Sequence, residues 1–473
     1  MFVARGYEMS VLEEAYDSRA LEMVVVYGRR RVGKTSLLRE FCRGRDRVHF
    51  FTARETTAIE NLAALSVSLL SWYEGDDGAL AETAPSPAFR SFEDAFSHAF
   101  AEGREKRTVL VIDEYPFLAR SYPGVSSLLQ SLLDKAKGVS AMMLVLCGSS
   151  TSFMREQVLG EKSPLYGRRT VQIRLKPFDY VDAAEMLGAD PERSLELYSL
   201  VGGVPLYLEQ LVGKRTARWN MANRMLGLGR FLYAEPENFM LQEVSAPASY
   251  NAVVDAIAHG RPRPSEIADA TGLAAPNVSE YLKTLCELGI VRRDTPVGKA
   301  NKKQVVYHIS DGLFRFHHTF APRYAAAIEA GMADRVAERI CAGDFSVYMG
   351  HAFEDACRQW ASRAMASGEV DMVPSAVGNW WGTDPAIREQ VDVDVVATGV
   401  DGELFAGECK WTSDPVDVDV LETLRHRAGL VADRISHVEL ALFSRSGFTR
   451  GCEREAAQAG NVRLVTPMDM FPG

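Results

Sequence analysis

Residues 23–38 read MVVVYGRRRVGKTSLL, an apolar β-branched run followed by a glycine-rich turn and then a helical pattern. The turn fits the spacing G-x-x-x-x-G-K-[ST], which begins at Gly28 and ends on Gly33, Lys34 and Thr35. Glycines let the backbone curl so that successive N–H groups point at a phosphate, and the following helix adds the positive end of its dipole. The stretch therefore predicts a phosphate-binding loop between a strand and a helix.

Each position of this loop has an expected role. Lys34 is expected to reach the β- and γ-phosphates of a nucleoside triphosphate, and the Thr35 hydroxyl is expected to ligate Mg²⁺. The expected nucleotide contacts are those of the whole loop: Gly28, Arg29, Arg30, Arg31, Val32, Gly33, Lys34, Thr35 and Ser36. ATP and Mg²⁺ are therefore the expected cofactors.

A second nucleotide signature lies at residues 109–114, VLVIDE, where a buried-type strand ends in two carboxylates. Asp113 is expected to hold Mg²⁺ through water, and Glu114 to orient and polarise the attacking water. A strand that merely ends in two acids is the alternative, but the loop at residues 28–35 occurs in the same chain. The pair Asp113-Glu114 favours hydrolysis over simple binding.

Several further stretches resemble the archaeal-type ATPase family of P-loop proteins, which is related to AAA+ and STAND-like signal-transduction ATPases. They are the lead-in FVARGYE at residues 2–8, with Ala4 in place of the usual glycine, PLYGR at 164–168 and GGVP at 202–205. The match covers about residues 1–240. It implies an ATPase core at 1–176 and a helical lid at 177–245.

The resemblance also assigns roles to three side chains outside the two signatures. Ser149, after the apolar strand pattern at 142–147, would sense the γ-phosphate, although a serine there can equally cap the next helix. Arg168 is a candidate to stabilise charge in the transition state, as is Arg169, while a solvent-exposed arginine is the plainer interpretation. Pro205 would pack on the adenine side.

The sequence pattern of residues 246–310 differs from that of the preceding part of the chain and predicts a winged helix-turn-helix domain. A helical pattern at 250–258 is broken by RPRP at 261–264, and a short helix, a Gly272 turn and a longer helix at 277–288 follow. Two short strand patterns, at 290–293 and 305–309, would form the wing. The wing carries one acidic residue, Asp294. It carries five basic residues: Arg292, Arg293, Lys299, Lys302 and Lys303. This excess predicts phosphate contacts with DNA, and a packing module is the alternative.

After linker helices at 311–345, residues 346–473 predict a second α/β domain. Asp392 and Asp394 alternate on one strand pattern, and Glu408 and Lys410 alternate on the next. With Glu354 on a preceding helix, these residues resemble the PD-(D/E)XK nuclease signature and the C-terminal domain that accompanies archaeal-type ATPases. The resemblance implies that Asp394 and Glu408 hold a metal ion, and that Glu354 and Lys410 complete the catalytic set. A catalytically silent interaction module is the alternative.

Composition limits the class of protein. The net charge of −10 argues against nonspecific binding of nucleic acid over the whole surface, and no apolar run reaches the ~18 residues that a transmembrane helix needs. Seven scattered cysteines without a Cys-x-x-Cys pair are typical of reduced thiols, so a cytoplasmic location is expected.

The predicted fold class is thus α/β: a P-loop NTPase core with a helical lid, a winged helix-turn-helix and a C-terminal restriction-endonuclease-like α/β domain. The expected partners are ATP and, through the winged helix and the C-terminal domain, DNA. No membrane partner is expected, and a homo-oligomer is left open.

Overall fold

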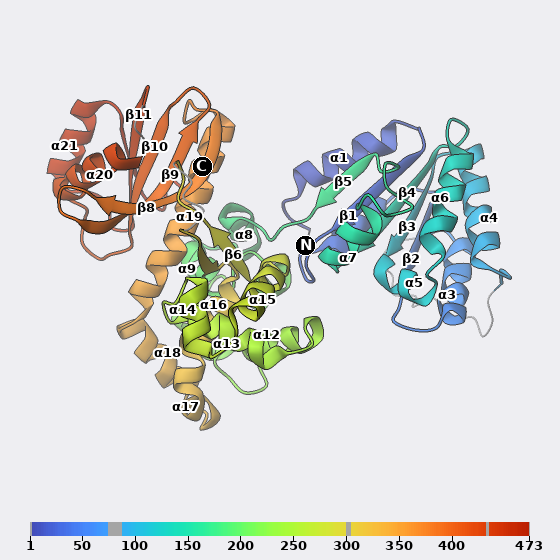
Figure 1. Ribbon diagram of the computed structural model, residues 1–473, viewed down its shortest axis with the longest axis horizontal. Coiled ribbons are helices and arrows are strands. Elements are labelled where there is room, and N and C mark those ends of the chain that lie inside the picture. The colour runs from blue at the N-terminus through green and yellow to red at the C-terminus, as the bar shows by residue number, and fades with distance from the viewer. Residues whose placement is uncertain (1, 74–87, 299–303, 432–434, 473) are drawn as a thin grey trace. The chain divides into compact units, whose positions relative to one another are not determined.

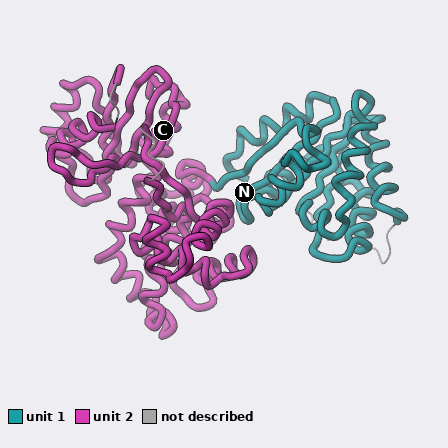
Figure 2. Tube along the Cα trace, in the orientation of Figure 1, with its two compact units in different colours: residues 1–177 teal, residues 178–473 magenta. Residues whose placement is uncertain are grey.

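The computed structural model describes residues 2–73, 88–298, 304–431 and 435–472 (Figure 1). The chain divides into two compact units, residues 1–177 and residues 178–473 (Figure 2). The basic wing residues Lys299, Lys302 and Lys303 lie outside the described residues.

The first unit is built on a five-stranded parallel sheet with the strand order β2-β3-β4-β1-β5. Its strands are β1 (Glu22–Tyr27), β2 (Val48–Thr52), β3 (Thr108–Asp113), β4 (Met142–Gly148) and β5 (Val171–Arg174). The central strands are buried throughout, which explains why they read as continuous apolar runs. The order places β1, which leads into the phosphate loop, between β4 and β5.

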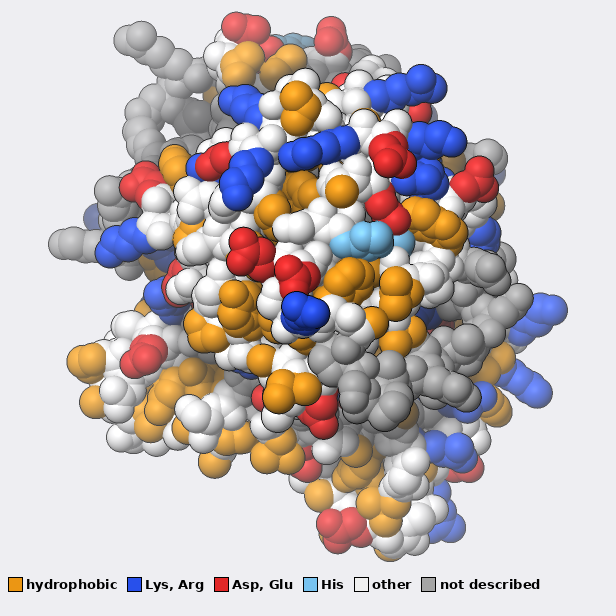
Figure 3. Space-filling model, turned by 90° about the vertical axis from the view of Figure 1, so that its right-hand side faces the viewer, with side chains coloured by type: hydrophobic (Ala, Val, Ile, Leu, Met, Phe, Trp, Pro, Cys, Tyr) orange, Lys and Arg blue, Asp and Glu red, His pale blue; other side chains and the backbone are white. Residues whose placement is uncertain are grey.

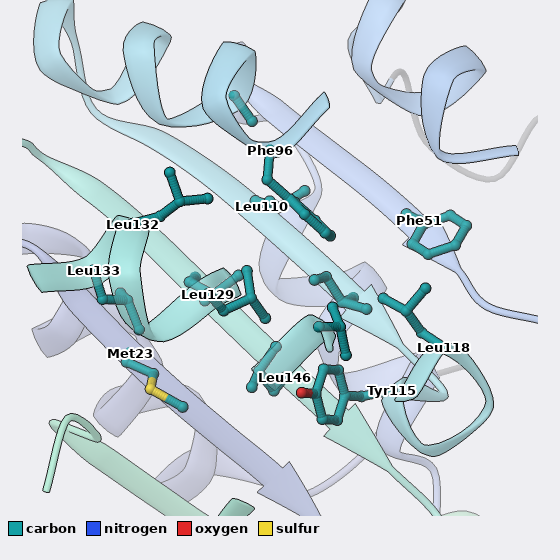
Figure 4. Packing of buried hydrophobic residues seen from close by; sticks show 14 of the residues in the cluster. Met23, Phe51, Phe96, Leu110, Tyr115, Leu118, Leu129, Leu132, Leu133 and Leu146 are labelled. Atoms are coloured by element: carbon teal, nitrogen blue, oxygen red, sulfur yellow. The ribbon is translucent and has the colours of Figure 1, made fainter. Parts of the chain in front are cut away.

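Helices cover both faces of this sheet, because alternate residues of each strand point to opposite sides. Met23 and Val25 pack with α3 (Ala58–Leu70), α4 (Phe92–Glu105), α5 (Tyr115–Ser121) and α6 (Val125–Ala136). Figure 4 shows part of that core, with Leu110 of β3 and Leu146 of β4 facing the helix side chains. On the other face, Val24 and Val26 pack with α1 (Gly6–Asp17) and α2 (Lys34–Cys42).

The second unit begins with short helices and continues into a helix-turn-helix region. The short elements are α8 (Tyr180–Leu187), α9 (Pro191–Val201), α10 (Pro205–Leu208), α11 (Ala217–Asn220), η2 (Met221–Met225) and α12 (Phe231–Glu243). The predicted three helices follow as α13 (Pro247–Ala258), α14 (Pro264–Thr271) and α15 (Ala275–Glu287). Gly272, with φ of 67°, makes the turn between the last two. The antiparallel wing strands are β6 (Val291–Asp294) and β7 (Val306–Ile309).

The remaining elements form the C-terminal part of the same unit. A helical segment of α16 (Gly312–Phe320), η3 (Pro322–Tyr324), α17 (Ala325–Glu329) and α18 (Ala333–Ala342) leads into the long α19 (Phe345–Ser367). A mixed sheet of order β12-β11-β10-β9-β8 follows. Its elements are β8 (Pro374–Asp384), β9 (Glu389–Gly399), β10 (Leu404–Lys410), α20 (Val418–Val431), β11 (Val438–Ser444), α21 (Arg450–Ala459) and β12 (Val462–Val465).

In this sheet β8, β9 and β10 are antiparallel neighbours, whereas β10, β11 and β12 run parallel. Helix α20 packs on one face of the sheet through Leu421 and Leu424. Helix α19 contacts β9 and β10, and its Trp360 lies edge-on to Phe443 of β11. The prediction of an α/β chain with a parallel P-loop-like sheet, a helix-turn-helix and a further sheet domain is therefore confirmed.

Candidate functional site

The phosphate loop runs from the end of β1 to the start of α2, and local packing explains its glycines. A side chain at Gly28 would place its Cβ 2.3 Å from the carbonyl oxygen of Leu175, so no larger residue fits there. Arg31 and Gly33 adopt left-handed backbone conformations, with φ of 72° and 87°. These conformations curl the chain before α2 begins at Lys34.

Lys34 lies within the curl of this loop. Its Nζ donates hydrogen bonds to the carbonyl oxygens of Gly28, at 2.9 Å, and Arg29, at 2.8 Å. The residue is only 6% exposed, and burial lowers the pKa of its ammonium, partly offset by Cys147, Glu114 and Asp113. A buried ammonium whose partners are two neutral carbonyls fits an anionic group such as a phosphate.

The structure brings Thr35 and Asp113 together from two different elements. The Thr35 hydroxyl at the start of α2 donates a 2.7 Å hydrogen bond to Oδ2 of Asp113 at the end of β3. Asp113 is 2% exposed. A hydroxyl beside a buried carboxylate is an all-oxygen donor set of the kind that Mg²⁺ prefers, so these residues fit the expected ion.

Glu114 lies beside this pair in a left-handed conformation, with φ of 51°. Its backbone N–H donates to Oδ1 of Asp113 at 3.0 Å, and its Oε2 accepts a 2.9 Å hydrogen bond from the hydroxyl of Ser149. The alternative role for Ser149, capping the next helix, is not realised. Helix α7 (Thr151–Phe153) starts after Ser150 and has no side-chain cap. Ser149 instead positions the Glu114 carboxylate.

The structure does not bring Arg168 to the phosphate loop of its own chain. Its guanidinium forms a two-pronged pair with the Asp134 carboxylate, at 2.9 and 2.8 Å, near the end of α6. Arg168 precedes β5, which runs parallel to β1, so it lies at the amino edge of the sheet. The loop follows the carboxyl edge, and the six residues of β1 span about 20 Å. Arg169 donates to the Leu159 carbonyl instead of approaching the loop.

Pro205 belongs to the second unit, where it is the first residue of α10. Its predicted adenine contact stays a prediction.

In the C-terminal sheet, Asp394 lies where β9 and β10 separate. Pairing of these strands ends at Val395 opposite Gly407, and β9 has a register shift at the same level against β8. Oδ2 of Asp394 accepts a 2.8 Å hydrogen bond from the backbone N–H of Cys409. The carboxylate thus takes the place of the missing strand partner, which holds Asp394 between the two strands.

Glu354 and Glu408 lie near this carboxylate. Burial, together with the negative charges of Glu354 and Glu408, raises the pKa of Asp394 to about 8. Lys410 donates a 2.6 Å hydrogen bond to Oε1 of Glu408, so the two residues share a face of β10 as predicted from alternation. Asp392 is exposed, and its carboxylate lies 3.7 Å from Arg427 of α20.

The described side chains hold no group of three or more His, Cys, Asp or Glu residues already arranged to bind a metal ion. The donor set at Asp394 and Glu408 is nevertheless all oxygen, and no described residue donates a hydrogen bond to Oε2 of the buried Glu408. These oxygen donors are of the type that binds a hard cation. The side chains of Asp394 and Glu408 would have to move before they could coordinate one together.

Sequence reasoning missed the charged residues that surround Glu354 on α19. Asp355 and Arg358 pair with one another, and Arg358 also donates to the backbone carbonyl of Asp394 at 2.7 Å. The spacing of three residues between an acid and an arginine on a helix was the available signal.

The comparisons with known proteins match three successive stretches of the chain. Residues 2–211 match an ATPase domain found predominantly in Archaea. Residues 252–295 match the IclR helix-turn-helix domain, and residues 317–422 match a domain of archaeal and bacterial proteins of unknown function. The match confirms that the chain carries an ATPase domain of the P-loop class, followed by a helix-turn-helix domain.

Three similar proteins span different parts of the chain. An uncharacterised protein of Methanocaldococcus jannaschii is 29% identical over 90% of each chain. An uncharacterised ATP-binding protein of that organism is 44% identical over 41 residues, which are 9% of this chain and 70% of that protein. The structure of a Walker-type ATPase of Pyrococcus abyssi superposes with a TM-score of 0.51 at 21% identity, covering 67% of this chain and 96% of that one. This last likeness is one of fold.

Within the described ranges, no helix combines the length and the apolarity needed to cross a lipid bilayer.

Proposed function

We propose that this protein is a regulatory ATPase whose first unit binds and hydrolyses ATP with Mg²⁺, and whose second unit acts on DNA. The observation that carries the proposal is the meeting of Lys34, Thr35, Asp113 and Glu114 at one edge of the parallel sheet. The match to an ATPase domain over residues 2–211 supports it.

Each of these residues has a separate role in the proposed reaction. Lys34 would exchange its two loop carbonyls for phosphate oxygens, and Thr35 and Asp113 would hold Mg²⁺, with Asp113 acting through water. When bound, the cation neutralises charge on the phosphates. Glu114 accepts a proton from the attacking water, with its carboxylate positioned by the Ser149 hydroxyl.

Two substitutions test this division. Lys34→Ala is expected to abolish tight ATP binding, because it removes the phosphate-binding ammonium. Glu114→Gln should retain binding but lose turnover, by about 10²-fold or more, because only the proton acceptor is removed. Binding is measured by calorimetry and turnover by phosphate release.

Exposed residues of the same unit provide the controls, Lys135→Ala on α6 and Glu93→Gln on α4. Both should behave as wild type. Normal hydrolysis by Glu114→Gln would exclude Glu114 as the catalytic base.

For the second unit we propose contact with DNA through the winged helix and, in the C-terminal domain, metal-dependent cleavage of a phosphodiester. The order of helix, three antiparallel strands, helix and parallel strand supports a PD-(D/E)XK-like domain, as does the proximity of Glu354, Asp394 and Glu408. In this assignment Asp394 and Glu408 would hold the metal ion, and Lys410 would assist at the phosphate. The alternative is an interaction module without catalysis, which the pairing of Lys410 with Glu408 favours.

A cleavage assay separates these two functions. Plasmid and linear DNA are incubated with the full-length protein and Mn²⁺ or Mg²⁺. Asp394→Asn and Lys410→Ala should each abolish cleavage and leave ATP hydrolysis intact, because the ATP site lies in the other unit. Asp371→Asn, exposed on the C-terminal part, is the matched control. No cleavage by the wild-type protein in any nucleotide state would favour the interaction module.

A further inference from the structure

A cavity of about 490 Å³ lies within the second unit, between the winged helix, α16 and α19. Small-molecule sites in proteins have volumes of about 300–1,000 Å³, so the cavity is large enough for a ligand of nucleotide size. Its lining includes Arg292 of β6, Arg315 of α16 and Arg358 of α19. One ligand could therefore contact three elements that are far apart in the sequence.

The three arginines converge on one largely buried carboxylate, that of Asp355. Asp355 accepts from Arg292 at 2.6 Å on Oδ1 and from Arg315 at 3.1 Å on Oδ2, and Arg358 pairs with it as well. Burial alone would raise the pKa of Asp355, but Arg292, Arg358 and Arg315 together hold it well below its usual range. Asp355 is therefore ionised under all ordinary conditions.

One buried hydrogen-bond donor of this cluster, Nε of Arg315, has no acceptor within the described chain, although Glu354 also pairs with Arg358 at 3.7 Å. Each guanidinium offers five N–H donors, whereas a carboxylate offers about four acceptor positions. Asp294 and the Asp394 carbonyl accept one bond each from Arg292 and Arg358. Buried donors without acceptors are costly, so a ligand rich in acceptor oxygens would stabilise the cavity. A phosphate group presents such oxygens in a geometry that guanidinium forks match.

Part of the same wall is aromatic, and the Arg315 guanidinium lies over the ring of Tyr348, 5.5 Å from its centroid. Phe320 and Tyr348 pack with their ring centroids 5.3 Å apart, and Tyr307 of β7 adds a third ring to the lining. The Tyr348 hydroxyl is tied to the Ser199 carbonyl at 2.7 Å, which holds this ring in place. Rings fixed in this way offer a face on which a planar base can stack.

We propose that this cavity binds a nucleoside monophosphate group, with the phosphate on Arg315 and its neighbours and the base against the aromatic wall. The group is either a free nucleotide or the 5′-phosphorylated end of a nucleic acid strand. This site is separate from the phosphate loop, and it requires neither ATP hydrolysis nor DNA cleavage. Bound ligand would link the winged helix to α19.

The test uses full-length protein carrying Lys34→Ala, so that the phosphate loop contributes no binding. Adenosine 5′-monophosphate, inorganic phosphate and adenosine are titrated by calorimetry. Saturable binding of the monophosphate is expected, with at least tenfold weaker binding of phosphate or adenosine alone. Oligonucleotides with a 5′-phosphate or a 5′-hydroxyl form the second arm, and tighter binding of the phosphorylated strand than of the mononucleotide identifies a strand end as the ligand.

Two further substitutions locate the binding. Arg315→Lys keeps the positive charge but removes the planar guanidinium with its paired N–H donors. It should weaken binding of the monophosphate about tenfold. Arg323→Ala, at the exposed rim where this arginine pairs with Asp344, should weaken it by a smaller factor and covers the case in which Arg315→Lys fails to fold. Arg335 is exposed on α18 and lies outside the cavity lining. Arg335→Lys is therefore the control for the loss of a guanidinium group at another site.

Absence of saturable binding, equal affinity for phosphate and the monophosphate, or unchanged affinity in both cavity variants would each overturn the proposal. ATP hydrolysis, measured without Lys34→Ala, should stay normal in the cavity variants. A failure of this inference therefore does not resemble a failure of the proposed ATPase.

Discussion

At the scale of single residues, the candidate ATP site depends on hydrogen bonds between side chains that lie far apart in the sequence. Thr35 and Asp113 are 78 positions apart, and Glu114 and Ser149 are 35 apart. Each residue type could be assigned a role from its motif, but the pairing of Ser149 with Glu114 depends on β4 lying next to β3 in the sheet. That adjacency makes Ser149 a positioning residue for the predicted catalytic base.

Ser149→Ala tests this positioning role. We expect kcat for ATP hydrolysis to fall about tenfold with little change in KM, because the Glu114 carboxylate loses the 2.9 Å hydrogen bond that orients it. In a protein that already carries Glu114→Gln, the same substitution should have almost no further effect, since residues that act as a unit are not additive. Additive losses would show that Ser149 acts on the nucleotide directly.

At the scale of elements, α16 contains a histidine whose environment disfavours its charged form. Burial, with a smaller contribution from the neighbouring His318, lowers the pKa of His317 to about 4, whereas Asp255 opposes the shift. The ring also lies near Tyr233 of α12, with centroids 6.3 Å apart. The folded protein therefore binds a proton at His317 less readily than the unfolded chain does.

This shift predicts a loss of stability in mild acid. The folded pKa is below the unfolded value of 6.5, so the contribution of His317 is fully present above pH 6.5 and is lost as pH falls towards 4. The full shift corresponds to about 3 kcal/mol at most. The free energy of unfolding of His317→Gln should fall less than that of wild type between pH 7.5 and pH 5, as measured with urea.

The exposed His259 on the same unit provides a control. His259→Gln should follow the wild-type curve. Parallel curves for wild type and His317→Gln would show that His317 titrates normally in the folded protein.

At the scale of the whole molecule, the distribution of charge sets how the chain can meet DNA. The net charge is −10, and on the face shown in Figure 3 basic and acidic side chains are interspersed. In the wing, Arg292 pairs with Asp294 and Asp355, and its predicted contact with phosphate stays a prediction. The exposed Arg293 and the lysines at 299, 302 and 303 are candidates as well.

Neutralising Lys299, Lys302 and Lys303 to alanine should weaken DNA binding. The slope of log K against log salt concentration should become shallower by about one unit for each phosphate contact that is lost. Affinity is measured by fluorescence anisotropy over a range of salt concentrations. The triple variant Lys106→Ala, Lys135→Ala and Lys137→Ala, exposed on the first unit, should leave the slope unchanged. A wild-type protein without DNA affinity at low salt would identify the wing as a packing element.

The sequence alone determined the local parts of this protein, because each depends on residues close together in the chain. The glycine spacing at 28–35, the strand ending in Asp113-Glu114, the three helices of the helix-turn-helix and the alternation of Glu408 with Lys410 all follow from backbone geometry and side-chain periodicity. Their positions in the structure agree with those patterns to within a few residues.

Tertiary structure alone decided which of these parts meet. Parallel pairing of β1 with β5 puts Arg168 at the edge away from the phosphate loop, although the motif PLYGR suggested an arginine at the phosphate. Packing of α19 against β6 and α16 turns Arg292 towards Asp355 and forms the arginine-lined cavity. Such pairings depend on the order of the strands in the sheet and on which buried charged side chains require a partner of opposite charge. Neither can be predicted from the spacing of residues along the chain.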